Sequence, residues 1–157
     1  MLGAMKLRST LPLIIGSAAI SVLLLGRPLW RAFGPTILIN HTSSIPNGFY
    51  LMKPRVQWEY GALVVFPAPK SVAREFSKRR WFHGEIPLIK PIGALPGDRV
   101  CINASFVSVN RSKLGPVLRK DFAGAPLPQH HRCFRVMRGH FLPLSTYSPR
   151  SFDGRYF

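Results

Sequence analysis

The chain has 157 residues, enough for one domain with a hydrophobic core but too few for two once a hydrophobic N-terminal stretch is set aside. Its 22 Lys and Arg residues outnumber 6 Asp and Glu residues, and the net charge of +16 would attract nucleic acid, anionic lipid or an acidic protein. Apart from residues 78–80, the basic residues are dispersed, and no nucleic-acid-binding motif accompanies them. We therefore expect no direct binding to nucleic acid.

An apolar stretch dominates the first thirty residues. It occupies residues 11–26, and no charged residue lies between Arg8 and Arg27. A helix of about 17 to 25 apolar residues spans a bilayer, so the stretch suits a short transmembrane helix or a signal peptide. A retained anchor is favoured because no Ala-x-Ala-like cleavage site follows. We expect an N-terminal segment, an anchor and a folded domain at residues 1–10, 11–27 and 35–157.

The remaining sequence is typical of a mainly β domain. Short runs of β-branched, aromatic and aliphatic residues are separated by Gly, Pro, Asn and Ser, and the 15 prolines and 13 glycines fit many turns. The predicted strands lie at residues 36–39, 48–52, 62–66, 87–90, 99–102, 106–109 and 139–144. Residues 111–132, rich in Pro, Gly and basic residues, predict a long excursion between strands. The pattern favours a β-barrel or a β-sandwich.

One segment has helical periodicity. Residues 70–80 place Val72, Ala73 and Phe76 on one face and most of the basic residues elsewhere. We expect a short amphipathic helix that closes one end of the sheet, in preference to a helix on a membrane surface.

The two cysteines, Cys101 and Cys133, lack the spacing of a zinc site, and no metal site is expected. In an oxidising compartment the pair could close a loop of roughly 30 residues and stabilise the fold by about 3 kcal/mol. The alternative is a pair of buried thiols. The five histidines, including His130 and His131, are interpreted as surface or loop residues.

Three polar clusters interrupt the hydrophobic pattern. The first, at residues 40–48, contains Ser44 in a Ser-x-Pro-x-Gly loop between two predicted strands, a composition that turns also use. The second contains Lys90 within an apolar run; such a lysine either reaches the surface or is buried. Burial can lower the pKa of a lysine from about 10.4 by 3 to 5 units, which would make it a base near neutral pH. The third contains Asp153, either half of a surface ion pair or an orienting carboxylate.

In combination, the three clusters resemble the type I signal peptidase superfamily. Residues 44–50 correspond to its Ser-x-Pro-x-Gly-x-Tyr nucleophile box, and Lys90 precedes the Leu-Pro-Gly-Asp sequence at residues 95–98 as the family's lysine does. Residues 151–157 are similar to the Ser-Phe-Asp-Ser-Arg-Tyr box of the conjugative-transfer branch, the TraF-type pilin-maturation peptidases.

Two departures from the family pattern are visible. Ile45 follows Ser44 where signal peptidases proper usually have Ser-Met, which favours the transfer branch. The family also continues beyond its aspartate box, whereas this sequence ends at Phe157. The resemblance therefore implies either a shortened chain or a missing last barrel strand, which would leave an unpaired sheet edge.

The resemblance also implies roles for individual residues. Ser44 would be the nucleophile and Lys90 its general base, with no metal or cofactor. The oxyanion would be held by the backbone N–H of Ser44 and by the Thr42 hydroxyl. Asp153 would position Lys90 or the groups that support it.

In the conjugative-transfer branch, which the chain resembles, the substrate is the hydrophobic precursor of a conjugative pilin. The resemblance therefore implies a peptidase anchored in the bacterial inner membrane, with residues 1–10 in the cytoplasm and the catalytic domain in the periplasm. Transfer-type members can also cyclise the pilin. The alternatives are a general leader peptidase and a non-enzymatic, membrane-anchored assembly protein of a secretion apparatus.

Overall fold

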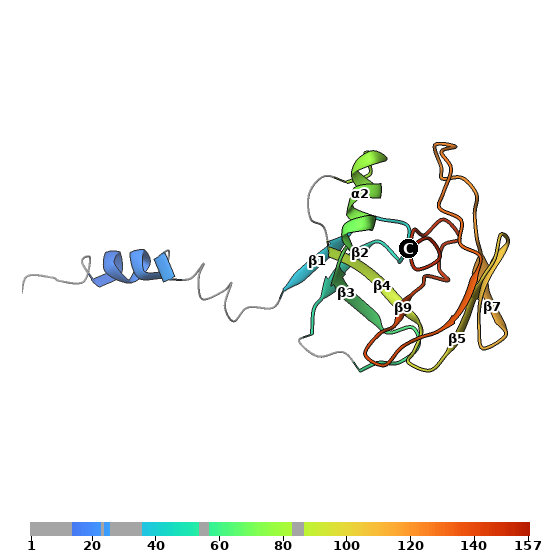
Figure 1. Cartoon of the computed structure of the whole chain (residues 1–157). Coiled ribbons are helices and arrows are strands. Elements are labelled where there is room, and N and C mark those ends of the chain that lie inside the picture. Colours follow the sequence, from blue (N-terminus) through green and yellow to red (C-terminus); the bar gives the residue numbers. More distant parts are fainter. Residues whose placement is uncertain (1–13, 23, 26–35, 54–56, 83–86) are drawn as a thin grey trace, which may run out of the picture. The chain divides into compact units, whose positions relative to one another are not determined.

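The computed structural model describes residues 14–22, 24–25, 36–53, 57–82 and 87–157 (Figure 1). The chain divides into two compact units, Met1–Ile37 and Leu38–Phe157, and each is described by itself.

The described part of the first unit is helical at residues 14–22 and 24–25. No helix within the described residues has both the length and the apolar character needed to cross a membrane. The expected segment 1–10 and parts of the expected anchor at 11–27 lie outside the described residues, so the anchor stays a prediction.

The second unit is mainly β, as predicted. Its described strands are β1 (Ile37–Asn40, which begins one residue before the unit), β2 (Gly48–Leu51), β3 (Leu63–Pro67), β4 (Pro87–Ala94), β5 (Arg99–Ile102), β6 (Phe106–Val109), β7 (Ser112–Pro116), β8 (Arg132–Arg135) and β9 (Leu142–Pro143). Within the described residues they form sheets of strand order β1-β2, β3-β4-β9 and β7-β6-β5-β8. The run predicted at residues 139–144 forms only the short β9, while the run at 87–90 extends to Ala94.

Strand β4 is the element that positions Lys90. Side chains alternate between the two faces of a strand, and in β4 Leu88, Lys90, Ile92 and Ala94 are all buried. Lys90 therefore points into the interior with three apolar side chains. The antiparallel partner β3 places Val64 opposite it.

The predicted short helix is confirmed as α2 (Lys70–Lys78), which follows the end of β3 in the chain. Figure 1 shows α2 at one end of β3 and β4. Val72 and Phe76, four residues apart on one face of the helix, are buried. Burial of side chains of this size stabilises the fold by roughly 1.5 to 3 kcal/mol each.

Strands β5 and β8 are joined by a disulfide. Cys101 and Cys133 lie opposite each other in the antiparallel register and are bonded to each other. Their separation of 32 residues corresponds, in the chain-entropy treatment, to about 3 to 4 kcal/mol of stabilisation.

The C-terminal segment is part of the core. Residues 151–156 are all buried, and the rings of Phe152 and Tyr156 stack with centroids 5.3 Å apart. Phe152 also contacts Phe76 of α2, at 5.6 Å between ring centroids. Because the two aromatic rings are fixed in the core, the polar residues between them are held in place.

Candidate active site

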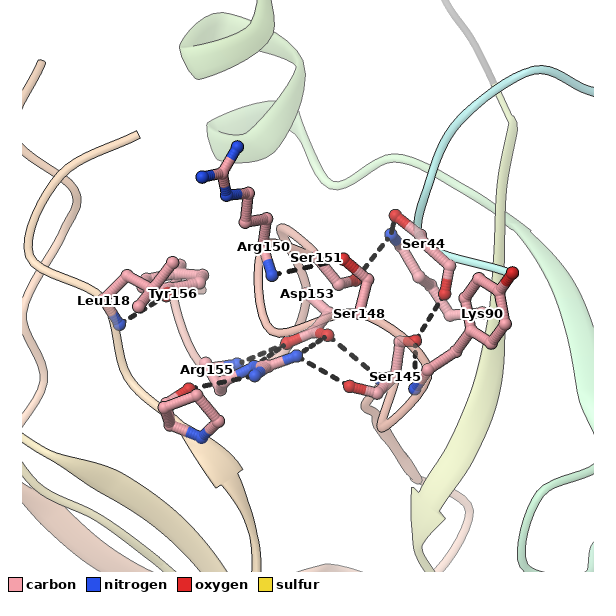
Figure 2. A network of polar contacts seen from close by, with 12 residues as sticks. Ser44, Lys90, Leu118, Ser145, Ser148, Arg150, Ser151, Asp153, Arg155 and Tyr156 are labelled. Carbon is pink, nitrogen blue, oxygen red and sulfur yellow. Dashed lines mark hydrogen bonds and ion pairs between the residues drawn. The ribbon is translucent and has the colours of Figure 1, made fainter. Parts of the chain in front are cut away.

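Ser44, Lys90 and Ser151 meet inside the second unit. Lys90 Nζ donates to Ser44 Oγ at 2.5 Å and to Ser151 Oγ at 3.1 Å, and all three residues are buried (Figure 2). Ser44 comes from the turn after β1, Lys90 from β4 and Ser151 from the C-terminal segment. The three clusters identified in the sequence therefore meet at one point, although Lys90 is 46 residues from Ser44 and 61 from Ser151.

The turn that carries Ser44 is held by a buried asparagine. Asn40 Nδ2 donates to the backbone carbonyls of Thr42, Ile45 and Pro46 at 2.8, 3.1 and 3.1 Å. Tyr50 supports the same turn, since its hydroxyl donates to the Pro46 carbonyl at 2.6 Å. A turn with this many internal bonds holds its residues in a defined geometry.

Thr42 is engaged in the same turn. Its hydroxyl donates to Asn40 Oδ1 at 2.7 Å, and its backbone N–H donates to the same oxygen at 3.2 Å. The hydroxyl would have to leave Asn40 before it could serve an oxyanion, so the role expected for Thr42 stays a prediction.

Burial changes the chemistry of Lys90. The side chain is only 5% exposed, and desolvation of the ammonium lowers the pKa of Lys90 to about 8. The Asp153 carboxylate raises this pKa and the Arg155 guanidinium lowers it. At pH 7 and a pKa near 8, about a tenth of the lysine is neutral, compared with roughly 1 in 2,500 at the ordinary pKa of about 10.4.

Asp153 forms a buried ion pair with Arg155. Arg155 Nε and Nη2 donate to Asp153 Oδ1 and Oδ2, both at 2.8 Å, and both residues have no exposed surface. Within the described residues, no hydrogen bond links Asp153 to Lys90. The carboxylate acts on the lysine through its electric field and not through a direct contact.

Ser145 links this ion pair to the nucleophile's turn. Its N–H donates to Asp153 Oδ2 at 2.9 Å and its carbonyl accepts from Arg155 Nη2 at 2.7 Å (Figure 2). Its hydroxyl donates to the backbone carbonyl of Ser44. The three polar groups of Ser145 thus connect the Asp153–Arg155 pair to the backbone of Ser44.

Sequence reasoning did not assign roles to four residues of this network, namely Asn40, Ser145, Ser151 and Arg155. Ser151 and Arg155 stand in residues 151–157, the segment similar to the Ser-Phe-Asp-Ser-Arg-Tyr box, and this similarity is the sequence signal that could have identified them. Asn40 and Ser145 carry no local signal, because Asn and Ser are common in any turn.

A groove of about 1230 Å³ opens onto Ser44 and Lys90. Its walls are rich in aromatic side chains: Phe76, Trp81, Phe82, Phe122, Phe152 and Tyr156. Concave, largely apolar surfaces with a few convergent polar groups are typical of ligand sites. In the part of the chain that the structure describes, no group of three His, Cys, Asp or Glu side chains could hold a metal ion.

The chain is similar in sequence to known proteins over most of its length. The chain belongs to the signal peptidase family, peptidase S26, whose family model matches residues 10–157.

Two similar proteins are both described as plasmid transfer protein TraF of Escherichia coli, and they are 33% and 31% identical to this chain over 129 residues. Each match covers 76% of this chain and 72% of the relative. No solved structure gives a significant match. The predicted resemblance to a TraF-type, signal-peptidase-like protein is confirmed.

Proposed function

We propose that the chain is a serine endopeptidase of a plasmid transfer system that processes a membrane-associated pilin precursor, with Ser44 as nucleophile and Lys90 as general base. The observation that carries the proposal is the buried 2.5 Å contact between Lys90 Nζ and Ser44 Oγ. The lowered pKa of Lys90 adds support, as does the likeness to TraF proteins.

In the proposed first step, neutral Lys90 accepts the proton of the Ser44 hydroxyl while Ser44 Oγ attacks the scissile carbonyl. The Lys90 ammonium then returns the proton to the leaving amine, and the acyl-enzyme remains. A water molecule, or an amino group of the substrate itself, completes the reaction by attacking the ester. The Ser151 hydroxyl, 3.1 Å from Lys90 Nζ, orients the amine throughout.

The tetrahedral oxyanion would be bound by the backbone N–H of Ser44 and by Thr42, once its hydroxyl has turned from Asn40. One such donor contributes roughly 3 to 4 kcal/mol to transition-state stabilisation. The network of Asn40 and Ser145 supports this step because it holds the Ser44 backbone in place before substrate arrives.

A location in the inner membrane with a periplasmic domain belongs to the same proposal. The Cys101–Cys133 disulfide supports it, since such bonds persist mainly outside the cytoplasm. The aromatic groove suits the hydrophobic precursor expected as substrate. The anchor at residues 11–27 would keep the enzyme at the membrane where that precursor resides.

The test is co-expression of the chain with the pilin precursor of its own transfer system, followed by mass spectrometry of the pilin. Ser44→Ala should abolish processing, whereas the matched control Ser105→Ala, at an exposed serine outside the groove lining, should retain it. A cyclised product would be lighter than the linear product by one water.

Processing by both the wild type and Ser44→Ala would mean that another peptidase is responsible. An intact precursor with both would refute the pilin-processing function. Cleavage of an ordinary secretory precursor at a comparable rate would favour the broader leader-peptidase activity.

A further inference from the structure

The groove that holds Ser44 and Lys90 carries additional positive charge. Arg80, Lys120 and Arg150 also line it, and all three are exposed. They come from the turn after α2, the loop after β7 and the C-terminal segment, and we call them the rim cations. Among the described residues, none of the three forms an ion pair. Figure 2 shows the guanidinium of Arg150 extending away from the buried network.

Within the described residues, the groove offers no unpaired acid to neutralise the rim cations. Asp121 is the one acidic residue among its described lining residues. One oxygen of Asp121 accepts from Arg79 Nη1 at 2.6 Å, and the other accepts from the backbone N–H groups of Ala123 and Ala125 at 2.9 Å. Because Asp121 is already paired, the described lining residues give the groove a net positive charge.

The chemistry of the groove is therefore mixed. Aromatic walls favour apolar side chains, and they lower the local dielectric, which strengthens the attraction between a cation and a bound anion. The positive charge favours negative groups and disfavours positive ones in the same segment.

We propose that this groove selects substrate segments that combine apolar side chains with a carboxylate, and that the rim cations bind the carboxylate. The carboxylate is either an Asp or Glu side chain or the free C-terminus of the substrate. The inference rests on the proposed peptidase function. A peptide is favoured over a lipid headgroup as the ligand because the rim cations line the same groove as Ser44 and Lys90.

Peptide binding tests the charge selection without requiring turnover. The probe protein is the full chain with Ser44→Ala in a neutral detergent, which keeps the groove but lacks the nucleophile. The ligands are four heptapeptides of alternating Leu and Ala with a neutral N-terminal fluorophore. The neutral peptide contains Gln and ends in a C-terminal amide. The Glu peptide and the Lys peptide replace this Gln and keep the amide, and the free-carboxylate peptide keeps Gln but ends in a free C-terminus.

Fluorescence anisotropy at low salt should show that a carboxylate peptide binds about 3- to 10-fold more tightly than the neutral one, as expected for a few exposed ion pairs. The Lys peptide should bind most weakly. Preference for the Glu peptide or for the free-carboxylate peptide identifies which carboxylate is recognised. Added salt should reduce the difference.

Substitutions of the rim cations test whether these residues cause the preference for carboxylate peptides. Changing the rim cations together to Gln should remove the preference, and Arg150→Gln alone should reduce it. The matched control Arg138→Gln removes the same charge at an exposed position outside the groove lining and should leave the preference intact.

Equal affinity for the neutral and carboxylate peptides, or a preference that survives the triple change, would overturn the proposal. If the wild-type chain processes its precursor but none of the four peptides binds, the proposal is also overturned. A triple variant that loses binding only to phosphatidylglycerol vesicles would assign the cations to lipid. Failure of the wild type to process the precursor would refute the pilin-processing function, whereas a peptide preference that depends on the rim cations would still show that the groove selects by charge.

Discussion

The pH dependence of processing tests the proposed base directly. If neutral Lys90 is the catalytic form, raising the pH removes its proton and increases kcat/KM until the lysine is fully neutral. With a pKa of about 8, the neutral fraction rises from about a tenth at pH 7 to about nine-tenths at pH 9. We therefore expect kcat/KM to increase about tenfold over this range and then to level off.

The assay is the initial rate of precursor cleavage by the purified full chain. It is measured from about pH 6 to about pH 10, a range that extends to both sides of the Lys90 pKa. Because the Asp153 carboxylate stabilises the ammonium, Asp153→Asn should shift the midpoint of the profile to lower pH. In a variant that folds, this shift should be measurable even where the maximal rate falls. Glu59→Gln removes one exposed acid and should leave the midpoint unchanged.

Two results would refute the reasoning. A rate that continues to rise tenfold per pH unit up to about pH 10 would mean that Lys90 keeps its ordinary pKa. A flat profile, in an assay where cleavage limits the rate, would mean that a group other than Lys90 is the base.

Further predictions concern the network and the fold. Ser145→Ala should lower kcat about tenfold with a smaller effect on KM, because the backbone carbonyl of Ser44 loses a buried donor; equal rates in single-turnover experiments would contradict this. Gly154→Ala should destabilise the fold by about 1 to 3 kcal/mol in urea unfolding, because a Cβ would lie 2.6 Å from Leu142 Cδ1. Replacing the Cys101–Cys133 pair by serines should lower the free energy of unfolding by about 3 to 4 kcal/mol, and an unchanged urea midpoint would exclude that contribution.

Much of the fold could be predicted because strand formation depends on local pattern. The alternating burial of β4 and the amphipathic face of α2 follow from the order of apolar residues alone. Strand β7 was missed, since its Ser-Lys-Leu-Gly-Pro sequence has little intrinsic strand preference and lies in the predicted excursion. It is formed by pairing with β6, and Arg155 donates to its Pro116 carbonyl at 2.9 Å.

The candidate site also has features that local motifs predict and features that only the tertiary structure decides. Ser44, Lys90 and Asp153 each stand in a motif a few residues long, but each motif alone also fits an ordinary turn or surface group, and their roles were predicted only from the resemblance of the three motifs in combination. Only the tertiary structure brings Lys90 Nζ between Ser44 and Ser151, and only packing decides that Asp153 bonds to Arg155 and not to the lysine. The physical reason is that a motif specifies residue types and local backbone geometry. Desolvation and long-range hydrogen bonds depend on which distant segments fill the space around each group.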